Sequence, residues 1–389
     1  MCYTLFIQNI LRMEVTNMNS YHRVYCLIDT NAIRNNISHI INNIPNDINL
    51  MPVVKADAYG HGALEVAKAI SDLSQFFCVA TIEEAMELRN AGIEKPILIL
   101  GTLSSHLFEE AVLNDISINI YTYEMAKKLS EVCEKCGKKA RIHISVDTGM
   151  NRIGLSCNEK GIEEALLIAS CENLIPEGIF SHYATADEDD KTTALLQRDR
   201  FSEFCSRLKE RGLTFEYQHI CNSAAICDLN DKSYSAVRPG IIIYGLYPSD
   251  EVSKELGLKP ALELKTHISY IKEVEAGEGI SYGHSYITKE KRTIATIPVG
   301  YADGYPRALS NKGRVIINGE YAPIVGRVCM DQFMVDISHI PNAKTEDTVT
   351  LIGTDGGAVV SADEIANICG TINYEIICGI GKRVPRVYK

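Results

Sequence analysis

The 389-residue sequence predicts an α/β fold: a (β/α)8 TIM-type barrel followed by a mainly antiparallel β domain. Between about Asn49 and Gly245, eight short β-rich runs alternate with helix-period segments, as in a (β/α)8 barrel. After about Pro260, alternating runs are separated by turns rich in Gly, Pro, Asn and Asp, which is typical of antiparallel strands. An open doubly wound sheet is the alternative for the first part. It is disfavoured because no G-x-G-x-x-G follows the first run.

The expected barrel elements carry clear boundary signals. Thr81 followed by Glu84 fits a capping box at a helix start, and Gly92, Gly137 and Gly212 fit helix ends. The expected strands are 51–55, 76–81, 97–101, 116–121, 141–147, 177–182, 217–222 and 235–238. The helix-period segments are 63–73, 81–92, 122–137 and 192–212.

The C-terminal part is expected to be mostly β, with one helix around 361–370. Its expected strands lie within 266–274, 292–300, 313–328, 333–338 and 347–353. The segment TINYEI, residues 371–376, is expected to form a turn. The sequence therefore predicts three parts, a dispensable N-terminal extension at 1–19, the barrel at 20–258 and the C-terminal β domain at 259–389.

Composition argues against several classes of protein. Acidic residues outnumber basic ones, 50 to 39, and the net charge of -11 argues against a nucleic-acid partner. No stretch approaches the ~18 uninterrupted apolar residues of a membrane span, so no membrane partner is expected. The 13 cysteines are scattered through apolar runs, which indicates reduced thiols in a cytoplasmic protein. Cys133 and Cys136 have metal-ligand spacing, but no second pair matches, so no metal site is expected.

Polar residues gather where the barrel strands are expected to end, the edge that carries function in such barrels. Lys55 ends the first strand, in the stretch VVKADAYGHG. Others on this rim are Tyr59, Asp147, Arg152, Ser181, His182, Asn222, Ser223, Arg238 and Gly240. Each has an ordinary structural explanation alone: a lysine can snorkel from a strand edge, and Asn222 can cap a helix. Their shared rim favours a functional site.

The residue types on this rim suggest a cofactor. Ser223 and the backbone amide of Ile241 follow strands seven and eight, where barrels commonly hold a phosphate. Lys55, across the rim, could hold an aldehyde as a Schiff base if burial lowers its pKa. A phosphate at one end and a Schiff base at the other describe pyridoxal phosphate. Arg238 would then face the pyridine nitrogen and donate to it without protonating it, and His182 would hold the guanidinium.

The β domain adds the stretch SYGHSY, residues Ser281 to Tyr286. Tyr282 lies between serine and glycine and is a candidate acid–base residue. Tyr286 is expected to pack on a sheet face.

From about Tyr21 to its C-terminus, the chain resembles alanine racemase, a two-domain enzyme that depends on pyridoxal phosphate (PLP). The segments that carry the resemblance are, in order, VVKADAYGHG, VDTGMNRIG, FSHYATAD, HICNSA, VRPGIIIYG, SYG, VGYADGYPR, GRVCMDQ and INYEIICGIGKRVPRVY. The resemblance implies an isomerase that interconverts L-alanine and D-alanine and supplies D-alanine for cell-wall peptidoglycan. It also implies a cytoplasmic homodimer whose active sites are shared between subunits.

The resemblance implies a role for each matching residue. Lys55 resembles the Schiff-base lysine, which also acts as the base on D-alanine. Tyr282 resembles the tyrosine, contributed by the partner subunit, that acts on L-alanine. Arg152 and the backbone of Met330, again from the partner subunit, resemble contacts to the substrate carboxylate.

The remaining implied residues fall into three groups around the cofactor. The phosphate cradle is implied to consist of Tyr59, Asn222, Ser223, Gly240, Ile241 and Tyr374. The pair behind the cofactor ring is His182 and Arg238. The substrate corridor is implied to be lined by Asp187, Tyr301, Asp303 and Arg307.

One position departs from the family pattern. Many members have a lysine two residues before the aspartate of DTGM, where it orients the arginine that follows. This chain has Ser145 there. Arg152 is therefore expected to be steadied by something else, such as an anion or a water molecule.

Three alternatives remain open at this point. The chain could racemise another small amino acid such as serine, because an apolar pocket near Ile372 and Tyr374 would reject one hydroxyl only weakly. A non-catalytic PLP-binding protein would not need the C-terminal β domain with Tyr282. A Schiff-base aldolase barrel would need neither that domain nor the cradle at Asn222 and Ser223.

Overall fold

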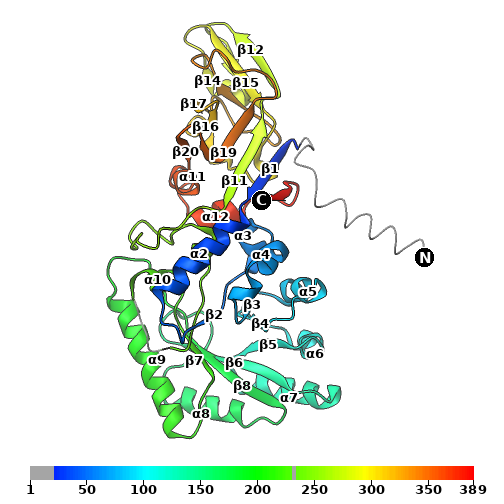
Figure 1. Cartoon of the computed structure of the whole chain (residues 1–389), viewed down its shortest axis with the longest axis vertical. Coiled ribbons are helices and arrows are strands. Elements are labelled where there is room, and N and C mark those ends of the chain that lie inside the picture. The colour runs from blue at the N-terminus through cyan, green and yellow to red at the C-terminus, as the bar shows by residue number, and fades with distance from the viewer. Residues whose placement is uncertain (1–21, 230–233) are drawn as a thin grey trace, which may run out of the picture. The chain divides into compact units, whose positions relative to one another are not determined.

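A computed structural model describes residues 22–229 and 234–389 of the chain (Figure 1). Contacts divide it into two units. The β unit comprises Leu264–Val360, Gly381–Pro385 and the described residues up to Cys26. The barrel unit comprises Leu27–Glu263, Ser361–Ile380 and Arg386–Lys389. The predicted extension at 1–19 lies outside the described residues, and the predicted boundary between 258 and 259 stays a prediction.

Seven of the eight predicted runs overlap a parallel strand, whereas the first, 51–55, lies directly after one and contains only a bridge at Val53, so Lys55 does not end a strand as predicted. The described part of the barrel unit thus places eight short parallel strands around the ring. They are β2 (Asn49–Leu50), β3 (Phe77–Val79), β4 (Ile97–Ile99), β5 (Ile116–Ile120), β6 (Ala140–Asp147), β8 (Leu174–Phe180), β9 (Tyr217–His219) and β10 (Ala236–Val237). Strands β3 to β9 form one parallel sheet, in which the two-residue β7 (Leu155–Ser156) pairs beside β6. Most side chains of these strands are buried, as expected for parallel strands covered on both faces.

The ring closes through three short connections. Strand β10 pairs with β2 in parallel. A parallel bridge joins Val53, just after β2, to Cys78 in β3. On the other side, the backbone N–H of Arg238 donates to Cys221 O at 2.9 Å, which ties the end of β10 to the end of β9. The predicted (β/α)8 barrel is confirmed.

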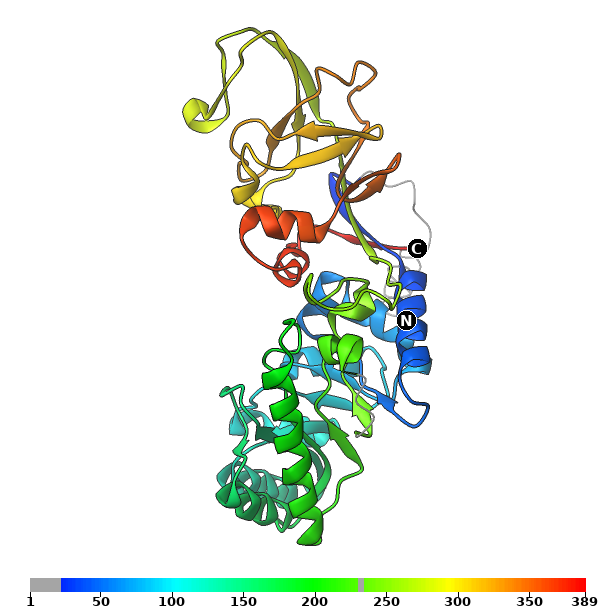
Figure 2. The same ribbon diagram turned by 90° about the vertical axis from the view of Figure 1, so that its left-hand side faces the viewer.

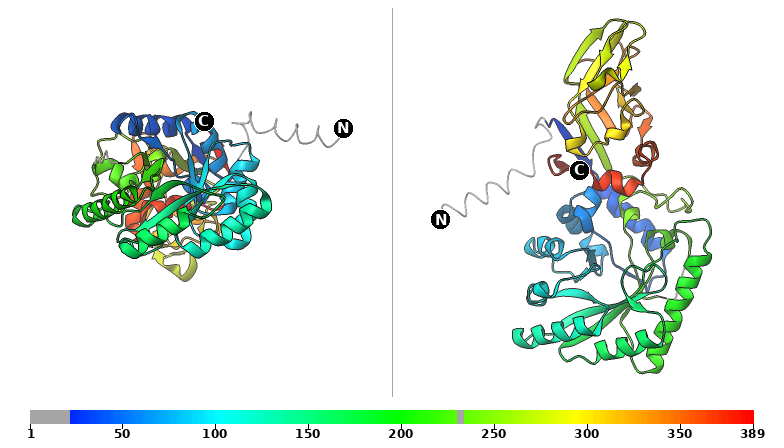
Figure 3. Two further views of the ribbon diagram at one scale, coloured as in Figure 1. Left: turned by 90° about the horizontal axis from the view of Figure 1, so that it is seen from below. Right: turned by 180° about the vertical axis from the view of Figure 1, so that it is seen from behind.

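Helices cover the outside of the barrel, as the view from below shows (Figure 3, left). They are α2 (Thr30–Asn43), α4 (Ala63–Ile70), α5 (Ile82–Asn90), α6 (Phe108–Leu113), α7 (Tyr123–Cys136), α8 (Glu159–Ala169), α9 (Thr192–Glu210) and α10 (Ser223–Asp228). The short α3 (Lys55–Gly60) is different, because its residues line a cavity of the barrel unit. The long α9 runs along the outside of the barrel strands (Figure 2). Thr81 caps α5 by accepting from the Glu84 backbone N–H, and Gly137 ends α7 in the left-handed conformation, as predicted.

The β unit consists mainly of antiparallel strands, which confirms that part of the predicted fold. One sheet orders β17, β16, β19 and β11, and another orders β12, β15 and β18. The strands of this part of the chain are β11 (Leu262–His267), β12 (Tyr270–Val274), β13 (Gly279–Ile280), β14 (Tyr286–Ile287), β15 (Arg292–Ile297), β16 (Arg314–Ile317), β17 (Glu320–Pro323), β18 (Phe333–Asp336), β19 (Thr348–Asp355) and β20 (Ala358–Val360). Two further strands, β1 (Val24–Ile28) and β21 (Arg386–Tyr388), lie near the ends of the described chain.

Two helices follow β20. The predicted helix is α11 (Ala362–Cys369), which Ser361 caps by accepting from the Glu364 N–H at 3.0 Å. The expectation of a turn at 371–376 is wrong, because α12 (Asn373–Cys378) begins there. No side chain of the described residues caps α12, and six residues are too few to show helical periodicity in the sequence. Among the described residues, no helix is long and apolar enough to cross a membrane.

Candidate active site

The predicted rim residues of the barrel unit lie around two adjoining cavities of about 400 and 410 Å³. Both cavities are lined by Lys55, His182 and Arg238. The first, which we call the cradle cavity, is also lined by Tyr59, Asp187, Asn222, Ser223, Gly240, Ile241 and Tyr374. The second, the arginine cavity, is also lined by Ser145, Asp147 and Arg152. Residues far apart in the sequence therefore meet at one place because the barrel brings its strand ends together.

Lys55 begins α3 and is partly buried between the two cavities. Removal from water lowers the pKa of its ammonium, and the positive charges of Arg152 and Arg238 lower it further. Glu84 and Cys378 act in the opposite direction but do not outweigh burial. The lysine therefore loses its proton more readily than a surface lysine, which is what a nucleophilic amine requires.

The segment after Lys55 is strained. Ala56, Asp57, Ala58 and Tyr59 all have left-handed backbone angles, with φ between 51° and 54°. Each such residue with a Cβ costs roughly 1–2 kcal/mol. The surrounding structure compensates with hydrogen bonds, because the Ala56 N–H donates to Glu84 Oε1 at 2.7 Å and the Ala63 N–H to Asp57 Oδ1 at 2.8 Å. Strain held in place by its surroundings is common at functional sites.

Glu84 is a site residue that the sequence did not identify. In the predicted capping box, the Glu84 carboxylate would accept from the backbone N–H of Thr81. Instead, Glu84 Oε2 accepts from the Ala80 N–H at 2.7 Å. Together the two oxygens join the end of β3 to the segment after Lys55. The signal in the sequence was Glu84 itself, but only the fold reveals what it contacts.

The cradle cavity has the donors and the space of an anion site. The Gly240 N–H donates to Ser223 Oγ at 2.8 Å, and Asn222 caps α10 by accepting from the Ala225 N–H at 3.0 Å. A Cβ at Gly240 would lie 2.7 Å from Tyr59 Oη, so only glycine leaves this space open. Burial raises the pKa of the Tyr59 hydroxyl, which therefore stays protonated as a hydrogen-bond donor.

Tyr374 contributes a second buried hydroxyl to the same cavity. Its ring centroid lies 6.0 Å from that of Tyr59. Burial, the Tyr59 ring and Asp187 all raise the pKa of Tyr374, so this hydroxyl also stays protonated. Two neutral tyrosine hydroxyls are suited to an anion, because a phosphate accepts hydrogen bonds.

Arg238 is buried at the base of both cavities. Its Nη1 lies 2.5 Å from His219 Nδ1 and donates to His219 O at 2.9 Å. Its Nη2 donates to Ser181 O at 2.7 Å and lies 3.3 Å from His182 Nδ1 and 3.4 Å from Ile220 O. Burial lowers the pKa of Arg238 to about 10, which still leaves the guanidinium charged at neutral pH.

His182 lies against this guanidinium as a neutral ring. Burial lowers its pKa to about 3, with further lowering by Arg238, Arg152 and Lys55. A neutral imidazole can accept a hydrogen bond at Nδ1, so His182 can hold Arg238 as expected from the sequence.

Arg152 and Ser145 share the arginine cavity. Asp147 Oδ1 shapes the loop by accepting from the backbone N–H groups of Gly149 and Asn151, at 2.9 and 3.0 Å. Ser145 is 2% exposed, and its Oγ has no hydrogen-bond partner among the described residues. The departure from the family pattern therefore leaves a small hydroxyl in the cavity that also receives Arg152.

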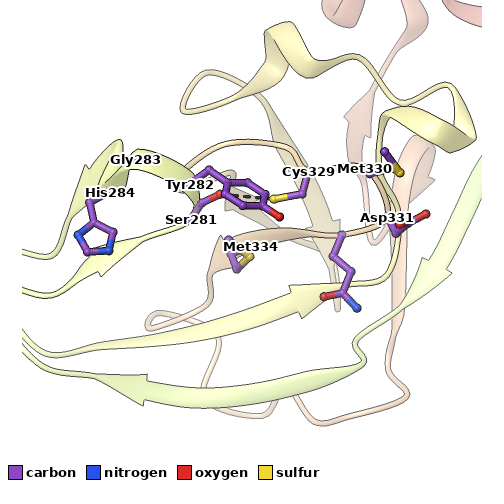
Figure 4. Close-up of a pocket in the computed structure, with 9 residues that line it drawn as sticks. Ser281, Tyr282, Gly283, His284, Cys329, Met330, Asp331 and Met334 are labelled. Atoms are coloured by element: carbon purple, nitrogen blue, oxygen red, sulfur yellow. Dashed lines mark hydrogen bonds between the residues drawn. The ribbon is translucent and has the colours of Figure 1, made fainter.

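The β unit has a cavity of its own, of about 630 Å³, lined by Tyr282 and Met330 (Figure 4). Tyr282 is 73% exposed and Met330 is 53% exposed. Ser281, with φ at 65°, sets the direction of the Tyr282 turn, and its Oγ donates to Arg327 O at 2.8 Å. Figure 4 also shows Cys329 beside this turn.

The predicted corridor residues of the β unit have different surroundings. Tyr301 is 43% exposed, and its N–H donates to Cys329 O at 3.1 Å, next to Met330. Arg307 begins the short turn Arg307–Leu309. Asp303 is buried and forms ion pairs with Arg23 at 2.5 Å and with Arg383 at 2.9 Å.

No group of three or more His, Cys, Asp or Glu side chains within residues 22–229 and 234–389 is placed to hold a metal ion. Cys133 and Cys136 both lie in α7.

Comparisons with known proteins identify the family. The profile of the alanine racemase N-terminal domain matches residues 28–248, and that of the C-terminal domain matches residues 261–388. The alanine racemase of Clostridium tetani is 47% identical over 368 residues, which are 94% of this chain and 95% of that protein.

Solved structures agree. The alanine racemase of Clostridium difficile 630 has a TM-score of 0.92 and 42% identity, and covers 96% of this chain and 97% of its own. That of Bartonella henselae, described with covalently bound pyridoxal phosphate, has a TM-score of 0.85 and 30% identity, and covers 95% of this chain and 100% of its own.

The barrel and the second, β-rich part therefore define a two-domain protein of the racemase type. The chain belongs to the alanine racemase family.

Proposed function

We propose that the protein interconverts L-alanine and D-alanine, with PLP as its cofactor. The observation that supports this most is the pair of adjoining cavities around which a lysine of lowered pKa, a cradle of neutral hydroxyl donors and a buried arginine meet. Family membership supports the same reaction.

The residues fit the cofactor at three places. Ser223, Tyr59 and the space left by Gly240 suit the phosphate, and the amine of Lys55 suits the aldehyde carbon. When bound, PLP supplies an electron sink that makes the α-proton of an attached amino acid acidic.

Arg238 suits the pyridine nitrogen. Of its five N–H groups, the four on Nη1 and Nη2 face acceptors inside the barrel. The Nε–H has no acceptor among the described residues, and Arg238 lines both cavities, so this group is the donor offered to the ring. A guanidinium keeps its proton, so Arg238 would donate a hydrogen bond to the ring nitrogen without protonating it.

Racemisation needs two groups on opposite faces of one carbon, one to remove the α-proton and one to return it. Lys55 is proposed to serve one face, because its lowered pKa makes the neutral amine accessible. The partner's Tyr282 is proposed to serve the other. Tyr282 is 73% exposed in a single copy, so its ring is accessible to a second copy in the proposed homodimer.

Arg152 and the partner's Met330 backbone are proposed to hold the substrate carboxylate. Arg152 would do so as a bidentate donor, which fixes orientation as well as charge. Asp187, Tyr301, Asp303 and Arg307 are proposed to form or shape the substrate corridor. The D-alanine would supply cell-wall peptidoglycan, and the cytoplasm is the proposed location.

The test is the rate at which purified protein with added PLP converts L-alanine to D-alanine, measured beside L-serine. We expect a strong preference for alanine, and abolition of turnover by Lys55→Ala. Faster turnover of serine would mean that the enzyme is a serine racemase with the same chemistry. Retained PLP binding without turnover of either would overturn the proposed reaction.

A further inference from the structure

A row of buried polar side chains crosses the barrel interior behind Arg238. We infer that Glu177 is the remote counter-charge of Arg238 and positions its guanidinium through His219 and His143. The inference rests on the proposed function in one respect only, that Arg238 donates to the cofactor.

The row is continuous by distance. From Arg238 Nη1 it is 2.5 Å to His219 Nδ1, and from His219 Nε2 it is 2.8 Å to His143 Nδ1. His143 Nε2 then lies 3.3 Å from Glu177 Oε1. His219 and His143 are fully buried, and the side chain of Glu177 is 10% exposed.

The chemistry of the two ends sets the direction of every hydrogen bond. A guanidinium only donates, so His219 must accept at Nδ1 and carry its proton on Nε2. His219 then donates to His143 Nδ1, which puts the His143 proton on Nε2, facing the Glu177 carboxylate. Burial lowers the pKa of both rings, so each carries a single proton and the row has one consistent arrangement.

The backbone is shaped to admit this row. In the pairing of β6 with β8, Ile142 is opposite Pro176 while His143 is opposite Gly178, so Glu177 is the extra residue of a bulge. Bulges re-aim side chains, here turning Glu177 toward the His143 ring. A Cβ on Gly178 would lie 2.1 Å from His143 Nδ1, so glycine is required where the ring passes.

Arg238 needs such a counter-charge. No carboxylate forms an ion pair with Arg238 in the part of the chain that the structure describes, and its near partners are carbonyl oxygens and neutral rings. An uncompensated buried charge is costly, and hydrogen-bonded rows polarise one another. Through the two rings, the negative charge of Glu177 polarises the Arg238 guanidinium. It therefore sets how strongly the Arg238 Nε–H donates.

Glu177 also has contacts outside the row, which supply a control. Ser117 Oγ donates to Oε1 at 2.6 Å, and Arg141 Nε lies 3.6 Å from Oε2 at the exposed end. Arg141→Gln removes a charge beside Glu177 without touching either histidine.

The first measurement is nitrogen NMR of the histidine rings in the protein without cofactor. The row requires protons on Nε2 and bare Nδ1 atoms in His143 and His219. A proton on Nδ1 of His219, or a doubly protonated ring, would overturn the inference, and neither outcome depends on the proposed function.

The second measurement compares Glu177→Gln with Arg141→Gln. Glu177→Gln keeps an acceptor for His143 but removes the charge, so it should shift the His219 nitrogen resonances and the absorption maximum of bound PLP. It should also lower kcat for alanine about tenfold, with little change in KM. An effect of this size is typical of a residue that orients a site residue without touching the ligand. Arg141→Gln should leave all of these in place.

A double variant separates the row from a direct field effect. With His143→Phe in place, Glu177→Gln should change nothing further, because the connection is already broken. An equal effect of Glu177→Gln in both backgrounds would overturn the role of the histidines. If His143→Phe does not fold, the ring NMR and the single-variant comparison still decide the matter.

Discussion

The Glu84 carboxylate accepts a hydrogen bond from the Ala56 backbone N–H at 2.7 Å, one residue after Lys55. Its other oxygen accepts from Ala80, at the end of β3. One side chain on α5 thus holds the left-handed segment that follows the proposed reactive lysine.

Glu84→Ala should therefore destabilise the protein by about 1–3 kcal/mol, the cost of leaving polar groups without partners. It should also slow reaction of Lys55 with PLP, because the strained segment would relax. Urea unfolding and stopped-flow absorbance check the two effects. Glu87→Ala, an exposed change in the same helix, is the control and should do neither.

Gly240 is the residue that keeps the cradle cavity open. Gly240→Ala would place a Cβ 2.7 Å from Tyr59 Oη, so we expect at least a tenfold loss of PLP affinity in an absorbance titration. The same clash should lower the thermal stability of Gly240→Ala. Adding Tyr59→Phe should restore much of that stability, since it removes the clashing oxygen. PLP affinity should stay low in that double variant because the phosphate donor is gone. An unchanged PLP affinity in Gly240→Ala would mean that the phosphate does not bind in this cavity.

How much of this site the sequence could predict depends on the kind of contact. The barrel and its rim residues follow from strand ends, because parallel strands must meet at one edge. The sequence alone therefore indicates Lys55, Ser223 and Arg238. Contacts made by bulges and left-handed turns leave no periodic signal, so it does not indicate Glu177 or Glu84. The turn expected at Tyr374 was wrong for a related reason, since α12 is too short to show a helical pattern.

Asp303 illustrates a side chain whose surroundings differ from the expected ones. Its side chain is 1% exposed and holds Arg23 and Arg383, while its backbone N–H donates to Gly300 O at 3.0 Å. Asp303→Asn should cost about 2–4 kcal/mol, because it leaves two arginines without their buried partner. Asp331→Asn, which breaks only the half-exposed pair with Arg383, should cost less than about 1 kcal/mol. Equal stabilities, measured by urea unfolding, would instead favour a corridor role without a structural one.

Ser145 lies in the arginine cavity, and its buried hydroxyl has no hydrogen-bond partner within residues 22–229 and 234–389. If an anion or water beside this hydroxyl steadies Arg152, Ser145→Ala should raise KM for alanine several-fold without lowering stability, since the hydroxyl has no partner to lose in the described part of the chain. Steady-state kinetics with and without added chloride distinguish an anion from water. A loss of stability would mean that the hydroxyl has a structural partner.

His61 makes stability depend on pH. Its ring stacks on Tyr244 at 4.5 Å, its Nδ1 lies 3.1 Å from the carbonyl oxygens of Ala58 and Tyr59, and burial lowers its pKa to about 4. Between about pH 6.5 and 4 the unfolded chain binds a proton here that the folded chain does not. Stability therefore falls as the pH falls through this window, by about 1.4 kcal/mol per pH unit for one such histidine.

His61→Phe keeps the stacked ring and removes the titration. Its absolute stability should drop, because the left-handed segment loses a donor to two carbonyls, but the decisive quantity is the slope of unfolding free energy against pH. Between pH 6.5 and 4 that slope should be smaller than in the parent chain by about 1.4 kcal/mol per pH unit, the contribution of one bound proton. If His61→Phe does not reduce the slope, the His61 ring is already charged in the folded protein over this pH range. Burial against Tyr244 would then not lower its pKa.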